Sequence, residues 1–145
     1  MKLTENFSLE ELSHSEIAIR RGLGNTPPAD VLPHLIVLAQ ALEKVRKVLG
    51  APMIVSSGYR SPEVNRAVGG TPTSAHCQGW AADFISPAFG TPQEVAKAIK
   101  GAGIAFDQLI YEGTWCHFSV DPRMRGNVLT AHFGPTGVAY SEGIA

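Results

Sequence analysis

The chain has 145 residues, of which 44% are hydrophobic and 17% charged, and its 12 basic and 13 acidic residues leave a net charge of −1. This length and composition exclude a disordered protein, and they predict one domain over residues 1–145, with a core over about 5–133 that needs no disulfide framework. The balanced charge argues against nucleic acid as a partner, because attraction to phosphates requires a basic excess.

The sequence also lacks the apolar stretches that membrane targeting requires. No run approaches the ~18 apolar residues of a membrane span, and residues 1–6 lack the apolar segment of a signal peptide. We therefore expect cytoplasmic synthesis and no membrane insertion. Cys77 and Cys116 form no Cys-x-x-Cys motif, and we expect both to be reduced and structural.

The first half of the chain predicts helices from their starting signals. Ser8 and Glu11 have the spacing of a capping box, which predicts a short helix that ends before Gly22 or Gly24. Residues 26–28, Thr-Pro-Pro, precede the stripe of the main amphipathic helix, which Gly50 ends. The stripe consists of Val31, Leu35, Leu38, Leu42, Val45 and Leu49.

After Gly50 the pattern alternates between short apolar runs and capped helices. The predicted strands are 53–57, 80–85, 108–112, 115–120 and 127–133. Short helices are predicted from Pro62 to Gly69 and from Pro92 to Gly101, with a loop over 71–79. Residues 134–145 are small and polar, and we expect a loose tail. The fold class is therefore α+β, with a small, mainly antiparallel sheet and helices packed on one face.

The two strands around Gly113-Thr114 have the spacing of a hairpin. A two-residue turn pairs Glu112 with Trp115 and Ile110 with His117. Because side chains alternate along a strand, Glu112 and His117 then point to the same side of the hairpin.

Asp83 is unusual because it lies within an apolar strand. A buried carboxylate costs several kcal/mol unless a cation compensates it. One candidate arrangement is a shared metal ion with His76, which lies seven residues earlier, and a simple ion pair with Arg60 or Arg66 is the alternative. His76, Asp83 and His117, with Glu112 as base, make up the inventory of a catalytic zinc site.

Each of these residues also has an ordinary structural explanation. Taken singly, a loop histidine such as His76 is more often solvated than a metal ligand, and a strand histidine such as His117 is more often a packed core residue. Glu112 beside a Gly-Thr turn is explained as an exposed glutamate. Only the joint occurrence of these residues favours the metal site.

Three segments together resemble the zinc D-alanyl-D-alanine carboxypeptidase family, peptidase family M15. They are Ser56-Ser57-Gly58-Tyr59-Arg60-Ser61, Ser74-Ala75-His76-Cys77-Gln78-Gly79-Trp80-Ala81-Ala82-Asp83 and Trp115-Cys116-His117-Phe118-Ser119. The resemblance covers about residues 5–120, and the middle segment is the most specific. Within the family, the chain is similar to the compact members found among phage endolysins and bacterial cell-wall hydrolases, whose fold carries the zinc site on its sheet.

The resemblance implies that His76, Asp83 and His117 bind one Zn²⁺ ion and that Arg60 lies beside the reacting carbonyl. It also implies a general base shortly before the last histidine. Many relatives place this carboxylate three residues before that histidine, where this chain has Thr114. We assign the role to Glu112 instead.

Asp107 and Asp121 are the alternatives for the general base. Ser74 is a candidate to bind substrate or to brace the His76 loop. Tyr59 is a second candidate to bind substrate. Like Trp80 and Trp115, it either lines the cleft or packs in the core.

The function implied is a zinc metallopeptidase, of D,D-carboxypeptidase or endopeptidase type, that cuts peptidoglycan stem peptides or cross-bridges. We expect a monomer that acts at the bacterial cell wall, as phage-encoded members of the family do. Thr114 favours an alternative, a binding module that keeps the fold and metal but recognises cell-wall peptide or a protein without cleavage. A virion-associated protein is a third possibility.

Overall fold

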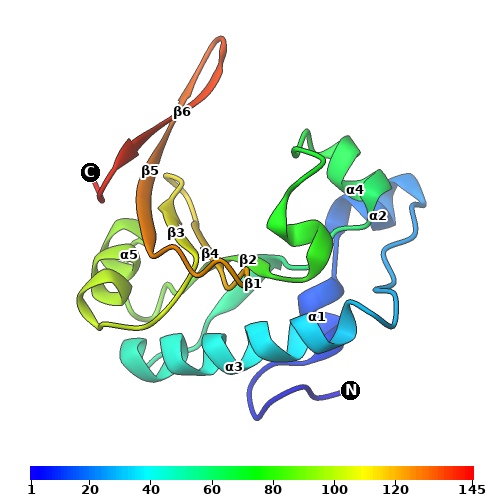
Figure 1. The fold of residues 1–145 in the computed structure, drawn as a ribbon, viewed down its shortest axis with the longest axis horizontal. Coiled ribbons are helices and arrows are strands. Elements are labelled where there is room, and N and C mark those ends of the chain that lie inside the picture. The colour runs from blue at the N-terminus through cyan, green and yellow to red at the C-terminus, as the bar shows by residue number, and fades with distance from the viewer.

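A computed structural model describes residues 1–145, and its centre is a six-stranded sheet (Figure 1). The strand order is β1-β2-β4-β3-β5-β6, and every neighbouring pair is antiparallel except β3 and β5. The strands are β1 (Ile54–Ser57), β2 (Ala81–Ile85), β3 (Gln108–Tyr111), β4 (Cys116–Ser119), β5 (Asn127–Gly134) and β6 (Gly137–Glu142). The predicted α+β class with a mainly antiparallel sheet is confirmed.

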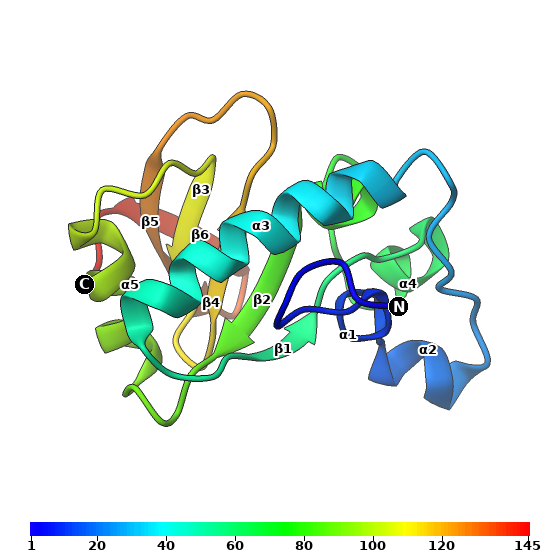
Figure 2. The same cartoon turned by 90° about the horizontal axis from the view of Figure 1, so that it is seen from below.

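Two helices cover one face of this sheet. Helix α3 (Leu32–Leu49) runs across the sheet, and α5 (Pro92–Gly101) packs beside it against β3 and β4 (Figure 2). One cluster of 21 buried residues joins them, and strand residues such as Phe84, Leu109 and Phe118 meet the apolar stripe of α3. Burial of each large side chain contributes about 1.5–3 kcal/mol. Asp83 and His117, which pair across β2 and β4, lie on the opposite face of the sheet from Phe84 and Phe118.

Helix α3 begins later than the Thr-Pro-Pro signal at 26–28 suggests. Its N-cap is Val31, and Pro33 lies in its first turn. Proline is tolerated only in the first turn, because inside a helix its ring meets the carbonyl four residues earlier. Pro33 therefore fixes the helix start near Leu32. None of the helices combines the length and apolar character needed to span a membrane.

The single first helix predicted before Gly22 is in fact two helices, α1 (Leu9–Ser13) and α2 (Glu16–Arg21). Ser15 is extended and its side chain accepts a hydrogen bond from the Ala18 N–H, so it starts a second helix instead of continuing the first. Helix α4 (Pro62–Ala67) follows the prediction, and the expected loop over 71–79 contains a short 3₁₀ helix, η1 (Ala75–Gln78).

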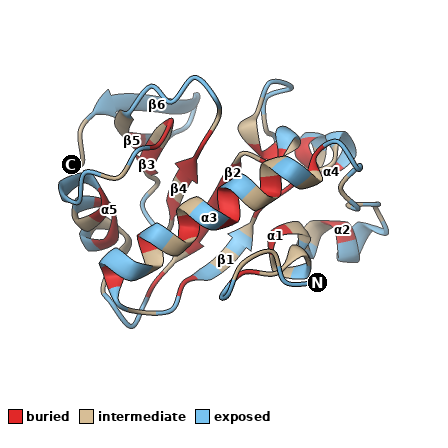
Figure 3. Ribbon diagram, turned by 60° about the horizontal axis from the view of Figure 1, so that its bottom comes forward, coloured by how far each residue is buried: buried red, intermediate tan, exposed pale blue.

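The expectation of a loose tail over 134–145 is wrong. Residues 137–142 form β6, which pairs with β5 along its whole length in a hairpin that projects beyond the other strands (Figure 1). Gly134 and Gly137 flank the two-residue turn, and the Thr130 hydroxyl holds the chain end by bonding to Gly143 and Ala145. All of β6 is nonetheless exposed to solvent (Figure 3).

Candidate metal centre

The face of the sheet opposite α3 and α5 brings together the residues that the sequence singles out. Asp83 on β2 lies directly across from His117 on β4. His76 reaches the same place from η1, whose first turn is capped by the Ser74 hydroxyl accepting from the His76 N–H. Gly79 then adopts a left-handed conformation, φ 76°, and returns the chain to β2.

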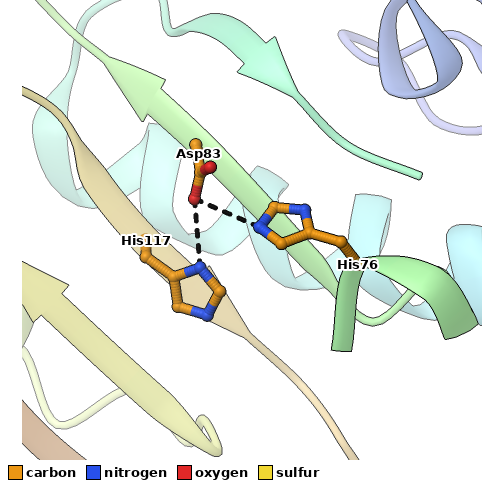
Figure 4. Close-up of side chains that lie close together, drawn as sticks. All are labelled: His76, Asp83 and His117. Carbon is orange, nitrogen blue, oxygen red and sulfur yellow. Dashed lines mark hydrogen bonds and ion pairs between the residues drawn. The ribbon is translucent and has the colours of Figure 1, made fainter. Parts of the chain in front are cut away.

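The three side chains point toward one another (Figure 4). The Asp83 Oδ1 atom lies 3.3 Å from His76 Nε2 and 3.0 Å from His117 Nδ1, and the three potential donor atoms all lie within 4.8 Å of one another. A tetrahedral Zn²⁺ with bonds of ~2.0–2.1 Å holds neighbouring donors about 3.3 Å apart. The donor set and its spacing therefore fit one zinc ion.

The protonation states also suit metal binding. His76 and Asp83 are buried, and the His117 side chain is 12% exposed. Burial lowers the pKa of His76 and so favours its neutral form. Burial alone would raise the pKa of Asp83, but the adjacent imidazoles of His76 and His117 outweigh it and hold that pKa well below its usual range. Neutral imidazole and ionised carboxylate are the forms that bind metal.

The His76 ring is oriented by the backbone of residue 58. Its Nδ1 atom lies 2.8 Å from the Gly58 carbonyl oxygen, which leaves Nε2 free to face Asp83. Gly58 packs directly on α1, because a Cβ there would lie 2.2 Å from the Leu12 carbonyl oxygen. The Tyr59 N–H donates to that same oxygen at 2.7 Å. Helix α1 thereby positions a carbonyl group that orients His76.

Arg60 orients the aspartate from the other side. Its Nη2 atom lies 3.3 Å from Asp83 Oδ2, while Nε donates to the Ser57 hydroxyl and Nη1 to the Asn65 side-chain oxygen. Asp83 therefore presents one oxygen to Arg60 and the other to the two imidazoles. The pairing of Asp83 with Arg60 and its approach to the histidines, weighed as alternatives from the sequence, occur together.

The β3–β4 hairpin has the predicted register. Ile110 pairs with His117, and the Glu112 N–H donates to the Trp115 carbonyl at 3.0 Å. Glu112 and His117 line one cavity, and the Trp115 indole N–H donates to Glu112 Oε2 at 2.9 Å. Burial raises the pKa of Glu112, with the Asp83 charge adding to the effect. A carboxylate with a raised pKa is suited to accept and release a proton.

The other candidate carboxylates already have partners. Asp107 is buried against Arg125 at 2.9 Å, and Asp121 pairs with Arg123 at 3.0 Å. Hydrogen bonds from these arginines lower the pKa of both aspartates, which makes them weak bases. Thr114 is exposed at the hairpin turn and does not line the cavity.

The remaining candidates lie in different surroundings. Ser74 and Trp115 line the cavity, whereas Tyr59 is buried in the core cluster and does not line it. Trp80 stacks on His34 with ring centroids 3.9 Å apart, which gives it a packing role. Both cysteines are free, as expected, and burial raises the pKa of the Cys116 thiol to about 12.

The cavity above His76, Asp83 and His117 has a volume of about 820 Å³. One wall comes from the segment 68–75 between α4 and η1, and another from the β5–β6 hairpin. Four residues that the sequence did not single out as functional also line the cavity: Arg123, Phe133, Val138 and Tyr140. Val138 and Tyr140 alternate with small residues, which is the pattern of a strand and was the available signal for β6. The glycines on either side of this segment favoured a loop instead.

Comparison with known proteins identifies the family of the chain. A family model described as Peptidase M15 matches residues 5–119, and no curated protein matches the chain. The matched range includes His76, Asp83, Glu112 and His117. Strands β5 and β6 lie beyond it.

Proposed function

Because the chain belongs to the peptidase M15 family, we propose that it is a zinc-dependent metallopeptidase that hydrolyses peptide bonds in peptidoglycan stem peptides or cross-bridges. One observation carries the proposal. The donor atoms of His76 and His117 lie 3.3 Å and 3.0 Å from one Asp83 oxygen, on the floor of a cavity that Glu112 also lines.

In this proposal His76, Asp83 and His117 hold a single zinc ion. When bound, zinc lowers the pKa of a coordinated water from ~15.7 toward ~7 and polarises the substrate carbonyl. The Gly58 carbonyl and the Arg60 guanidinium keep His76 and Asp83 in place. Such orienting contacts are typically worth 10–100-fold in metal affinity or activity.

Glu112 is the proposed general base. It lines the cavity but is not one of the three clustered donors, so it stays available to take a proton from the attacking water. Its raised pKa then allows it to return that proton to the leaving amine. The Trp115 indole N–H fixes one carboxylate oxygen, which limits the directions in which Glu112 can reach.

Arg60 and Ser74 are the proposed substrate-facing groups. The Arg60 guanidinium lines the cavity and places positive charge where the carbonyl oxygen becomes negative in the transition state. Ser74 lines the same cavity and also caps η1, so it combines substrate contact with bracing of His76. The burial of Tyr59 favours a packing role over the substrate contact expected for it.

Peptidoglycan is the substrate that the resemblance favours, and the bacterial cell wall is then the place of action, as for a phage endolysin. Stem peptides carry free carboxylates, for which Arg60 and Arg123 in the cavity provide positive charge.

The test is incubation of the purified protein with peptidoglycan, with and without a zinc chelator. New amine termini or released D-Ala should appear only without the chelator, and added zinc should restore their release. Binding to peptidoglycan without chelator-sensitive release would instead identify a non-catalytic cell-wall binding module.

A further inference from the structure

The β5–β6 hairpin extends the catalytic face of the sheet. Ile110 pairs with His117 on one side and with Leu129 of β5 on the other, so these residues share one face. Alternation along β5 then puts Phe133 on this face, and pairing puts Val138 opposite Phe133. Tyr140 pairs with Ala131 on the same face.

Three apolar side chains of this hairpin face the cavity of the metal centre, and we call Phe133, Val138 and Tyr140 the hairpin wall. They are 58%, 45% and 54% exposed. The Phe133 ring also contacts Trp115, with centroids 6.2 Å apart, so the wall is continuous with the residue that holds Glu112. Large apolar groups gathered at the rim of a cavity are typical of a ligand-binding surface.

The facing wall is different in character. It is formed by the segment 68–75, where Val68 is the one large apolar residue and Gly69, Gly70, Thr71 and Thr73 leave a small, polar surface. The hairpin wall carries no charged side chain, and its only polar side-chain atom is the Tyr140 hydroxyl oxygen. An occupant that lies across the cavity therefore meets backbone groups, hydroxyl groups and the single apolar side chain of Val68 on one side, and the continuous uncharged apolar surface of the hairpin wall on the other.

We propose that the hairpin wall binds an uncharged, apolar side chain of the peptide substrate close to the bond that is cut, and so determines specificity. This inference rests on the proposed peptidase function, which places the scissile bond at the metal centre. It assigns a role to β5 and β6, which lie outside the segment that the family model matches.

The test compares Phe133→Ser/Tyr140→Ser with Phe89→Ser, in purified zinc-loaded protein. Phe89 is 39% exposed and lies away from the cavity, so its substitution controls for loss of an exposed aromatic ring. For peptidoglycan hydrolysis, we expect the double variant to raise the apparent KM about tenfold with little change in maximal rate or zinc content. The Phe89 variant should match the wild type.

A single substitution tests the same inference in case the double variant disrupts the β5–β6 hairpin. Val138→Lys introduces a charge into the wall at a 45% exposed position, and Val37→Lys makes the same change at a 44% exposed position on α3. Circular dichroism should give the same spectrum for both. Only Val138→Lys should raise the KM.

A binding measurement separates failure of this inference from failure of the proposed function. Trp115 lines the cavity, so its fluorescence reports binding of a soluble stem pentapeptide ending in D-Ala-D-Ala. If the wild type does not cleave peptidoglycan but binds this peptide, about tenfold weaker binding by the double variant still supports the wall. Kinetics and binding equal to the wild type would overturn it, as would a wild type that neither cleaves nor binds the pentapeptide.

Discussion

Replacement of Gly58 by alanine should damage both the fold and the metal centre, although residue 58 contacts no metal. The Gly58 carbonyl orients His76, and the Gly58 Cα faces the backbone of α1. A Cβ at this position would lie 2.2 Å from the Leu12 carbonyl oxygen and 2.8 Å from its carbon, whereas ordinary contact begins at 3.4 Å. The two backbone segments must therefore separate by about 1 Å.

The expected cost follows from this displacement. Overpacking against the backbone costs about 1–3 kcal/mol, and a chain of this length loses roughly 3–4 °C of Tm per kcal/mol. The Tm should fall by about 3–12 °C. The same movement carries the Gly58 carbonyl away from His76 Nδ1, so zinc affinity should fall about 10–100-fold.

Thermal unfolding and competition with a chromophoric zinc chelator measure the two effects. The matched control is Gly101→Ala at the end of α5, where a Cβ meets nothing within 4 Å. That substitution should leave zinc affinity unchanged and keep or slightly raise the Tm. If Gly58→Ala matched the wild type in both measurements, the proposed coupling between α1 and His76 would be refuted.

The remaining predictions concern the charged groups. His76→Ala or Asp83→Ala should abolish stoichiometric zinc in elemental analysis, and full metal content would contradict the ligand assignment. Glu112→Gln should keep zinc but slow turnover by about 10²-fold or more. Wild-type turnover should fall in acid at a higher pH than an ordinary glutamate would give, because burial raises the pKa of Glu112 and protonation removes the base. Arg60→Ala should slow turnover far more than it lowers zinc content, so unchanged kinetics would exclude its role. Asp107→Asn should lower the Tm at pH 7, and the Tm difference from the wild type should close below about pH 4. The reason is that a carboxyl group with a lowered pKa stabilises the fold only while it is ionised. A Tm difference that does not depend on pH would show that the ionised carboxylate is not its cause.

The parts of the site that local rules fix could be predicted from the sequence. A two-residue Gly-Thr turn allows one pairing of its strands, so the placement of Glu112 and His117 on one face follows from counting. The anomaly of Asp83 in an apolar strand pointed correctly to nearby compensating groups, since a buried carboxylate must be paired.

The parts that depend on distant segments could not be predicted. The Gly58 carbonyl meets His76 across 18 residues, and no pattern in the sequence marks that contact. The break at His14-Ser15 arises because Ser8 and Ser15 each cap a helix, and the presence of a serine does not by itself reveal that a second helix starts there. Strand β6 is held by its pairing with β5 and by the Thr130 hydroxyl. Most of these contacts come from residues before 134, so the composition of 134–145 alone could not predict the strand.

The contacts that hold the ligand side chains have a consequence for how the ion is acquired. Arg60 holds Asp83 and the Gly58 carbonyl holds His76 through bonds that involve only protein atoms. The apoprotein should therefore remain folded after chelation, unlike zinc fingers, whose folding requires their metal. Reconstitution then becomes a simple bimolecular association, and a spectroscopic substitute such as Co²⁺ can be loaded into the native apoprotein without a refolding step.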